Sequence, residues 1–453
     1  MNNFIAKHLV FSPVQAVRGE RVKDYLTDVK RVERYPLDEI REIQLDKLRR
    51  LIAHSYKNIP YYTELFDANK INPDDIRTYS DLQKIPVLTK RTILDNEKKL
   101  VNSALSEKMR IRKTGGSTGM TLHFLKERKA LALNDAVMYR CYGWYGIDIG
   151  DRQVRFWGVP VTAKLRWREQ IKDFVLNRIR ISAFDISEAS CLKQYERIKR
   201  FKPDYFYGYT TAIYGFCLFM KKLGIDLNSL NLKAVICTAE KMYSHHVNLF
   251  NEVFKCPVVD EYGSSENGIL AFQCKKDNMH MMSDHMCIEF LDENNHHVKP
   301  GELGRISVTD LVSYGMPLIR YEIGDIGRPS DKKCTCGVNL PLMEIVEGRK
   351  EDFIRIKEGK LVHAAYLCYT LKDDTVNEFK MYQKDMTTLL VQIVKSPAFN
   401  SITEKMLDKK LRTALGNDMK ITFEYLDRIP RESSGKLRYF VSEMKNVGSM
   451  NIE

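Results

Sequence analysis

The sequence predicts an α/β protein with a large N-terminal domain, whose mixed and parallel sheets are flanked by helices, and a small α+β C-terminal domain. Two observations predict this class. Between residues 105 and 310, short apolar strand-like segments alternate with amphipathic helical segments, which favours largely parallel strands. After residue 348 the pattern becomes a compact mixture of strands and one helix. The length of 453 residues also exceeds what one core normally organises.

We divide the chain between residues 347 and 348. Residues 1–105 are mostly helical in pattern, and Asp38 opens a segment whose apolar residues recur every three to four positions through residue 56. Residues 106–347 form the α/β part of the N-terminal domain, 1–347. Residues 348–453 form the C-terminal domain.

The α/β part contains three clear strand patterns, at residues 153–158, 232–237 and 257–260. Ser187 and Glu188 open a helix that runs to Arg200, and Ser244 is the predicted cap of the next helix. A more β-rich stretch begins at residues 305–309.

In the C-terminal domain, residues 379–394 have strand patterns. The segment from Ser401 to Glu404 has the form of a capping box before a helix with one apolar face. Gly416 suits the end of that helix. Residues 421–425 alternate like a half-buried strand.

The composition excludes several classes of protein. Ten cysteines in a chain of this length do not indicate a disulfide scaffold, and no apolar run is long enough to span a bilayer. The formal net charge of +13 favours anionic ligands or peripheral contact with a membrane surface. Since no zinc-finger, basic-zipper or RNP motif accompanies the charge, we expect no specific nucleic-acid binding. A cytoplasmic location is the expectation, because the N-terminus lacks a signal-peptide pattern.

Five segments carry chemistry. The first, Lys113–Gly119, combines three glycines with hydroxyl side chains, so its backbone N–H groups can surround phosphate oxygens. The second, Asp260–Glu266, directly follows a strand, where side chains of an open α/β sheet face the ligand crevice. The others are residues 320–325, 348–352 and 430–436, the last of which presents Lys436. Each alone is also compatible with an ordinary surface loop.

In this order, the five segments resemble the signature motifs of the adenylate-forming superfamily. The chain most resembles the phenylacetate–CoA ligase branch, including the CapK-like proteins named for capsular polysaccharide biosynthesis. The resemblance covers about residues 105 to 440 and implies the adenylate-forming fold with a mobile C-terminal domain. It implies a ligase that uses ATP and Mg²⁺ to form an acyl-adenylate, releases pyrophosphate and passes the acyl group to coenzyme A.

The resemblance assigns roles to residues. Lys436 and Glu266 would be catalytic, and Glu266 would also bind Mg²⁺. Glu351 would stand at the domain hinge, where aspartate is usual in the family. The nucleotide-binding residues would be Thr114, Gly115, Gly116, Ser117, Thr118, Gly119, Thr238, Ala239, Glu240, Glu261, Tyr262, Gly263, Ser264, Asp325 and Arg349.

The role of Lys436 has a physical basis. Adenylation brings a carboxylate against a polyanionic phosphate, and a lysine and Mg²⁺ at that point stabilise the charge of the transition state. The carboxylate is already ionised near neutral pH, so no general base is required.

Two thiolates at Cys334 and Cys336 stand in a glycine-containing turn, and Cys274 and His280 lie earlier in the chain. Three thiolates and one imidazole are a standard set for tetrahedral structural zinc. His285 and Cys287 remain as alternative ligands, and a pair of ordinary cysteines is the other interpretation.

In the family, the pocket for the acid is lined by side chains from between the first two segments. The candidates there are Trp144, Trp157, Tyr207, Tyr209 and Phe216, and each could instead belong to the core. The partners expected are a small carboxylic acid, ATP and coenzyme A, with a second copy of the chain in a homodimer. Basic residues at 164–180 and 193–202 are candidates for binding the coenzyme A phosphates. Two alternatives stay open: acyl transfer to an amine or hydroxyl in surface polysaccharide biosynthesis, and a catalytically silent nucleotide-binding scaffold.

Overall fold

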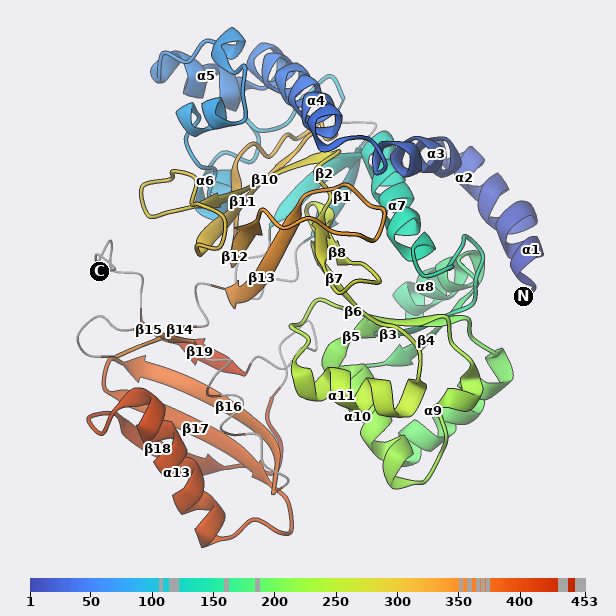
Figure 1. The fold of residues 1–453 in the computed structure, drawn as a ribbon, viewed down its shortest axis with the longest axis vertical. Coiled ribbons are helices and arrows are strands. Elements are labelled where there is room, and N and C mark those ends of the chain that lie inside the picture. Colours follow the sequence, from blue (N-terminus) through green and yellow to red (C-terminus); the bar gives the residue numbers. More distant parts are fainter. Residues whose placement is uncertain are drawn as a thin grey trace. The chain divides into compact units, whose positions relative to one another are not determined.

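The computed structural model describes residues 1–105, 109–113, 122–158, 163–183, 188–349, 353–356, 361–363, 367, 371, 375–430 and 439–444. The chain divides into two compact units, residues 1–346 and 347–453. The predicted fold class is confirmed, since a large mixed sheet lies between helices in the first unit and a separate smaller sheet forms the second (Figure 1).

The large sheet is parallel on one side and antiparallel on the other. Its described strands follow the order β10-β11-β12-β13-β9-β8-β7-β6-β5-β3-β4. The parallel strands are β3 (Gln153–Trp157), β4 (Arg178–Ser182), β5 (Tyr205–Tyr209), β6 (Ala234–Thr238) and β7 (Val258–Ser264). The antiparallel extension comprises β8 (Gly268–Gln273), β9 (Met279–Met281), β10 (Met286–Leu291), β11 (Gly304–Asp310), β12 (Tyr321–Ser330) and β13 (Leu342–Arg349).

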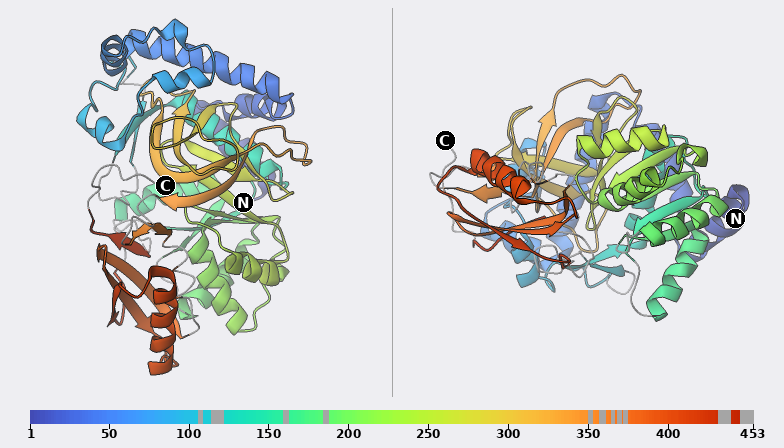
Figure 2. Two further views of the ribbon diagram at one scale, coloured as in Figure 1. Left: turned by 60° about the vertical axis from the view of Figure 1, so that its left-hand side comes forward. Right: turned by 90° about the horizontal axis from the view of Figure 1, so that it is seen from below.

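Helices cover both faces of the parallel strands, and the central strand β6 is accordingly buried along its whole length. On one face lie α9 (Glu188–Phe201), α10 (Thr210–Lys222) and α11 (Ser244–Phe254), packed on Phe156, Phe206 and Val235 (Figure 2). The other face carries α7 (Arg128–Gly143), while α8 (Ala163–Val175) precedes the edge strand β4. The cap of α11 is Tyr243, whose backbone N–H donates to His246 Nδ1, so the prediction of Ser244 as cap is wrong by one residue.

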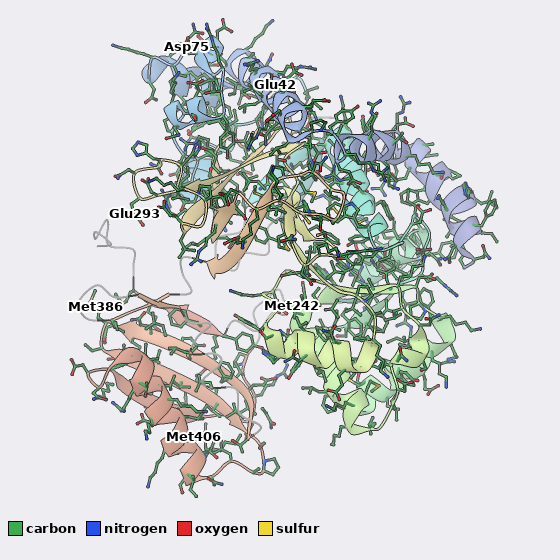
Figure 3. All side chains as sticks on the ribbon, viewed as in Figure 1. Glu42, Asp75, Met242, Glu293, Met386 and Met406 are labelled. Atoms are coloured by element: carbon green, nitrogen blue, oxygen red, sulfur yellow. The ribbon has the colours of Figure 1, made fainter. Side chains whose placement is uncertain are left out.

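The helical N-terminal segment consists of α1 (Asn3–Ile5), the π-helical turn η1 (Ala6–Phe11), α2 (Ser12–Arg18), α3 (Val22–Val32), α4 (Leu37–Asn58), α5 (Pro60–Ala68) and α6 (Lys90–Asp95), with short turns at Pro73–Asp75 and Ser80–Lys84. The exposed Glu42 and Asp75 mark its outer side (Figure 3). Its inner side buries Leu48, Leu51 and Phe66. Among the described residues, no helix is both long enough and apolar enough to cross a bilayer.

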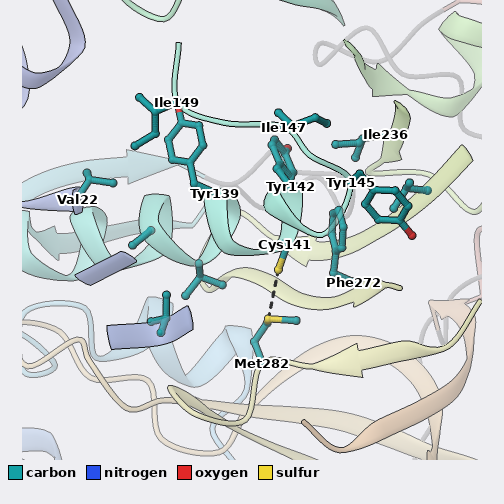
Figure 4. Close-up of a cluster of buried hydrophobic side chains, with 14 of the residues drawn as sticks. Val22, Tyr139, Cys141, Tyr142, Tyr145, Ile147, Ile149, Ile236, Phe272 and Met282 are labelled. Carbon is teal, nitrogen blue, oxygen red and sulfur yellow. Dashed lines mark hydrogen bonds between the residues drawn. The ribbon is translucent and has the colours of Figure 1, made fainter. Parts of the chain in front are cut away.

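Helix α7 contributes much of the central core. Tyr142 near its end and Tyr145 just beyond it pack against Phe272 of β8, while Tyr139 packs edge-on against Phe11 (Figure 4). Cys141 lies between them and contacts the sulfur of Met282 at 3.6 Å. The helix is therefore buried along most of its length and holds the sheet from behind.

The second unit has its own core. Strands β16 (Val376–Asp385), β17 (Thr388–Lys395), β18 (Lys420–Tyr425) and β19 (Phe440–Ser442) form a sheet in the order β18-β17-β16-β19, and α13 (Ser401–Leu415) buries Leu407, Leu411 and Leu415. A small hairpin pairs β14 (Phe353–Arg355) with β15 (Leu361–His363). The helix cap is Asn400, whose side chain accepts the N–H groups of residues 402 and 403, so the predicted capping box at Ser401 is wrong by one residue.

Candidate active site

Three of the predicted site residues, Tyr209, Thr238 and Glu261, lie at the carboxyl ends of neighbouring parallel strands. Tyr209 pairs with Thr238 across β5 and β6, and Thr238 pairs with Glu261 across β6 and β7. In an open parallel sheet these ends face the ligand crevice. Strand pairing thus brings together residues that are more than fifty positions apart in the chain.

The segment after β6 is held in a defined conformation. Ala239 has a φ of +65°, which is unusual for a residue with a side chain. The carboxylate of Glu240 accepts hydrogen bonds from the backbone N–H and the hydroxyl of Thr211, both at 2.8 Å. Since Thr211 lies in the first turn of α10, the positive end of that helix also favours the charge. The carboxylate of Glu240 thus fixes this segment to α10, and the backbone of residues 238–240 lies at the carboxyl end of β6.

A pair of contacts joins β7 to β12. The phenol of Tyr262 donates a hydrogen bond to Asp325 Oδ2 at 2.8 Å. The phenol of Tyr321, at the start of β12, lies 3.3 Å from Glu266 Oε1 and donates to it. Two of the predicted carboxylates are therefore positioned by tyrosines, Glu266 in the β7–β8 turn and Asp325 on β12.

Gly263 is required by the close approach of the backbone at that turn. A Cβ atom at this position would lie 2.4 Å from the carbonyl oxygen of Gly268. The register between β7 and β8 shifts between Tyr262 and Gly263, which turns the chain toward Glu266.

Glu261 points away from its neighbours Asp260 and Tyr262, as alternation along a strand requires. Its buried carboxylate accepts hydrogen bonds from Tyr142 at 3.0 Å and Tyr207 at 3.1 Å. Burial raises the pKa of Glu261, although the hydroxyl of Thr238 and the two phenols oppose this by hydrogen bonding. The structure thus places Glu261 in a polar network beneath the strand ends, where its side chain orders Tyr207.

Asp260 is a carboxylate to which sequence reasoning gave no role. Burial, followed by the neighbouring charge of Glu261, raises the pKa of Asp260 to about 7. Its backbone N–H donates to Gln273 Oε1 at 2.8 Å. Its position directly after a buried strand was the signal in the sequence.

Tyr207 and Tyr209 lie together with Trp157, whose ring centroid is 5.9 Å from the first and 4.2 Å from the second. The guanidinium of Arg155 stacks over Trp157 at 4.4 Å and over Tyr207 at 5.1 Å. Arg155 was missed in the sequence, although alternation in β3 places it on the same face as Trp157.

Trp144 has a different environment from the one predicted. Its indole N–H donates to Glu33 Oε2 at 3.0 Å, and its ring packs edge-on against His280 and Phe272. Trp144 therefore lies beside the cysteine cluster, whereas Trp157, another of the predicted candidates, lies with Tyr207 and Tyr209. The reason is that α7 ends at Gly143, so Trp144 leaves the helix toward β9.

Cys274, His280, Cys334 and Cys336 form one cluster. Their ligand atoms all lie within 4.8 Å of one another. The sulfurs of Cys274 and Cys334 are 3.7 Å apart, and Cys336 Sγ lies 3.3 Å from His280 Nε2. Zinc–sulfur bonds of about 2.3 Å in a tetrahedron require sulfurs about 3.8 Å apart, so the spacing fits zinc.

The surroundings of the cluster fit a metal as well. His280 Nδ1 is 2.8 Å from the carbonyl oxygen of Leu340, which selects the tautomer with Nε2 directed at the thiols. Burial lowers the pKa of His280, which favours the neutral ring that metals bind. His285 is paired with Asp284 at 3.0 Å, and Cys287 is buried in β10, so the two alternative ligands lie outside the cluster.

Several predicted residues lie outside the described part of the chain. These are Thr114–Gly119, Glu351 and Lys436. Arg349 is the last residue of β13, where only the backbone is described.

The hairpin that carries residues 114–121 is well anchored. Strands β1 (Met109–Lys113) and β2 (His123–Glu127) pair up to Lys113 and His123. Buried Lys126 pairs with Asp310 of β11 and donates to Ser313 at 2.7 Å. This buried pair was missed, because a single lysine in a strand pattern reads as an exposed residue.

Comparisons with known proteins show which families and folds the chain is similar to. A family model described as the CapK C-terminal domain matches residues 354–443. Protein CapK of Staphylococcus aureus is 24% identical over 98% of this chain and all of its own length. A phenylacetate–coenzyme A ligase of Aromatoleum evansii is 25% identical over 91% of this chain and 97% of its own length. Among solved structures, a 2-hydroxyisobutyryl-CoA ligase in the postadenylation state has a TM-score of 0.74, with 18% identity and 91% of each chain covered.

Proposed function

Because the chain is a relative of CapK and of the phenylacetate–coenzyme A ligases and has the adenylate-forming fold, we propose that it is an AMP-forming acid ligase. It activates a small carboxylic acid with ATP and transfers the acyl group to coenzyme A. The observation that carries this proposal is the hydrogen bonding of Asp325 by Tyr262 and of Glu266 by Tyr321, which links the end of β7 and the turn after it to β12. Named relatives that act on coenzyme A support the choice of acceptor.

In the first half-reaction, a carboxylate oxygen of the acid attacks the α-phosphorus of ATP. A new O–P bond forms, the bond to the β-phosphate oxygen breaks, and pyrophosphate leaves with the bonding electrons. The ring of Tyr262 packs on the adenine, and Asp325 accepts hydrogen bonds from the ribose hydroxyls. Glu266 would hold the magnesium ion, which would neutralise phosphate charge. Lys436 bridges the acid and the α-phosphate.

In the second half-reaction, the thiol sulfur of coenzyme A attacks the acyl carbon. The bond from that carbon to the AMP oxygen breaks, AMP leaves, and the thiol proton passes to solvent. The C-terminal domain, residues 348–453, would turn about Glu351 between the steps and withdraw Lys436.

The acid would bind beside Tyr207 and Tyr209. Their stacking with Trp157 and Arg155 supports an aromatic wall with one fixed positive charge. Buried Glu261 holds the phenol of Tyr207 and so fixes that wall. An aryl or otherwise planar acid is the class of substrate that this wall fits best.

The four-residue cluster would hold a structural zinc ion. The sulfur spacing of 3.7 Å and the hydrogen bond from His280 to Leu340 support this assignment. Zinc would join the turn after β8 to the turn after β12, and therefore would stabilise β12, which carries Asp325, and β8, which pairs with the strand that carries Tyr262.

The first test is acid-dependent pyrophosphate release, screened over aryl, alkyl and amino acids with and without coenzyme A. An Asp325→Asn variant should raise KM for ATP by about tenfold or more, because it replaces one acceptor of the ribose hydroxyls. Asp331→Asn, which changes an exposed carboxylate just beyond the same strand, is the matched control. A silent scaffold is the conclusion if no acid releases pyrophosphate.

A second candidate acceptor is an amine or hydroxyl of a surface polysaccharide precursor. The match to the CapK C-terminal model and the full-length similarity to CapK favour it. The two acceptors separate cleanly in one assay. The protein with acid and ATP would first release pyrophosphate. If coenzyme A then releases no AMP and an amino sugar does, the acceptor is the polysaccharide precursor.

A further inference from the structure

Helix α8 presents an apolar stripe to the outside of the molecule. Trp167, Ile171 and Phe174 are spaced by four and three residues, so they share one face of the helix. Their side chains are 64%, 44% and 64% exposed. A surface helix of a globular protein normally directs such a stripe at the core.

The opposite face of α8 is charged and faces the protein. Asp173 pairs with Arg178 of β4 at 2.6 Å, and Glu169 pairs with Arg180 at 2.6 Å. A further contact of 3.1 Å joins Arg180 to Asp173. Because these ion pairs fix the rotation of the helix, the apolar stripe cannot turn inward, and its exposure is a property of the fold.

Basic side chains flank the stripe. Lys164, Arg168 and Lys172 are four residues apart and form an exposed row beside the apolar face. Of the three, Lys172 also reaches Glu169 at 2.5 Å. The helix therefore has an apolar face next to a basic one, as helices that lie at membrane surfaces do.

A cavity of about 540 Å³ opens next to the stripe and is lined by Phe174 and Met1. Its lining includes four arginines and two carboxylates: Arg166, Arg178, Arg180, Arg197, Glu169 and Asp173. The guanidinium groups exceed the carboxylates by two, so the cavity favours an anion. Guanidinium forks match phosphate oxygens in geometry.

The N-terminal segment formed by α1 and η1, residues 3–11, extends the same surface. Turn η1 packs beside α8, and the views of the ribbon show the two next to each other (Figures 1 and 2). Phe4, Ile5 and Leu9 on this segment are exposed, with Phe4 and Leu9 at 66% and 65%. The carbonyl of Met1 accepts a hydrogen bond from Asn177, directly after α8, at 3.2 Å.

We propose that α8 and the N-terminal segment formed by α1 and η1 dock the protein on an anionic lipid bilayer, with a lipid phosphate in the arginine-lined cavity. The net charge of +13 and the basic row complement an anionic surface, and tryptophan and phenylalanine are the side chains that bilayer interfaces favour. This proposal does not depend on the proposed ligase activity.

The test is flotation of the full chain with vesicles of phosphatidylcholine alone and of an equal mixture with phosphatidylglycerol. We expect binding only to the mixture, and weaker binding as salt is added. In a W167S/F174S double variant the partition coefficient should fall by about tenfold or more, because two large apolar side chains are lost. The matched control is L218S/I402S, which removes two other exposed apolar side chains. Both variants should keep the thermal stability and the ATP affinity of the parent.

Brominated lipid provides a second readout. Of the three tryptophans, Trp167 is largely exposed while Trp144 and Trp157 are half-buried, so quenching should arise at residue 167 and disappear in the W167F variant.

Three results would overturn the proposal. The first is an absence of binding to the anionic vesicles, or equal binding by W167S/F174S and its control. The second is a dimer in gel filtration that W167S/F174S dissolves, which would assign the stripe to a second copy of the chain. The third is loss of vesicle binding upon adding coenzyme A, which would assign the cavity to the coenzyme phosphates.

Discussion

Loss of the proposed zinc site should lower stability by an amount that the chain topology sets. Cys274 and Cys334 are 60 residues apart, so a metal at the cluster closes a loop of that length. Closing such a loop restricts the unfolded chain by about 4 kcal/mol at 25 °C. A unit of 346 residues unfolds with an entropy that corresponds to about 0.7 kcal/mol per degree, so Tm should fall by about 6 °C.

The variant that tests this is Cys336→Ser, because Cys336 lies 3.3 Å from His280 Nε2 and a serine hydroxyl binds zinc poorly. Cys256→Ser is the matched control, since Cys256 is a half-buried cysteine outside the cluster. Elemental analysis should find one zinc per chain in the parent and in Cys256→Ser, and little in Cys336→Ser. Scanning calorimetry should show the fall in Tm in Cys336→Ser alone. A parent protein without zinc, or equal melting temperatures for the two variants, would refute the reasoning.

Three further predictions concern buried groups. Arg140→Met should destabilise the protein by about 3–5 kcal/mol in urea titrations, because the buried carboxylate of Asp284, which lies 2.7 Å from Arg140, loses the guanidinium. A double variant with Asp284→Asn should recover part of the loss. Full additivity of the two changes would contradict the pairing. The free energy of unfolding of Asp260→Asn, taken relative to that of the parent, should rise by about 2 kcal/mol between pH 5 and pH 8. The parent loses stability over this range, because the pKa of the Asp260 carboxyl is about 7 in the folded chain and about 4 in the unfolded chain. A constant difference in stability at the two pH values would show that the pKa of the carboxyl is not perturbed. Gly208→Ala should destabilise by about 2 kcal/mol or more in thermal unfolding, since a Cβ there would lie 2.3 Å from the carbonyl oxygen of Phe156, and an unchanged Tm would rule out that close approach.

Much of the fold was predictable from the sequence because its signals are local. Apolar runs such as residues 232–237 specify buried parallel strands, and Gly416, with a φ of +87°, ends α13 as expected. Caps were less predictable, because serine and asparagine compete for the same role one residue apart, and Asn400 rather than Ser401 takes it.

The site was predictable where motifs directly follow strands. Tyr262 and Asp325 were singled out from their motifs, but their contact joins strands that are not neighbours in the sheet, because β8, β9 and β13 stand between β7 and β12. The sequence could not show in which direction a side chain points, or which side chains far apart in the chain form pairs. Glu261 turns beneath the sheet, Trp144 turns toward His280, and the buried Lys126–Asp310 pair joins residues 184 positions apart. Such contacts depend on the assembled sheet and leave no short pattern in the chain.

The measurement that tests the central claim most directly is acid-dependent pyrophosphate release by the parent and by Lys436→Ala, at saturating ATP and with the best acid from the screen. We expect the parent to release pyrophosphate and Lys436→Ala to release it about a thousandfold more slowly, because the charge of the transition state is no longer neutralised. The ATP affinity of the variant should stay within a few-fold of that of the parent. Lys420→Ala, a change of an exposed lysine in the same domain, should leave the rate unaltered. Undiminished pyrophosphate release by Lys436→Ala would contradict the account.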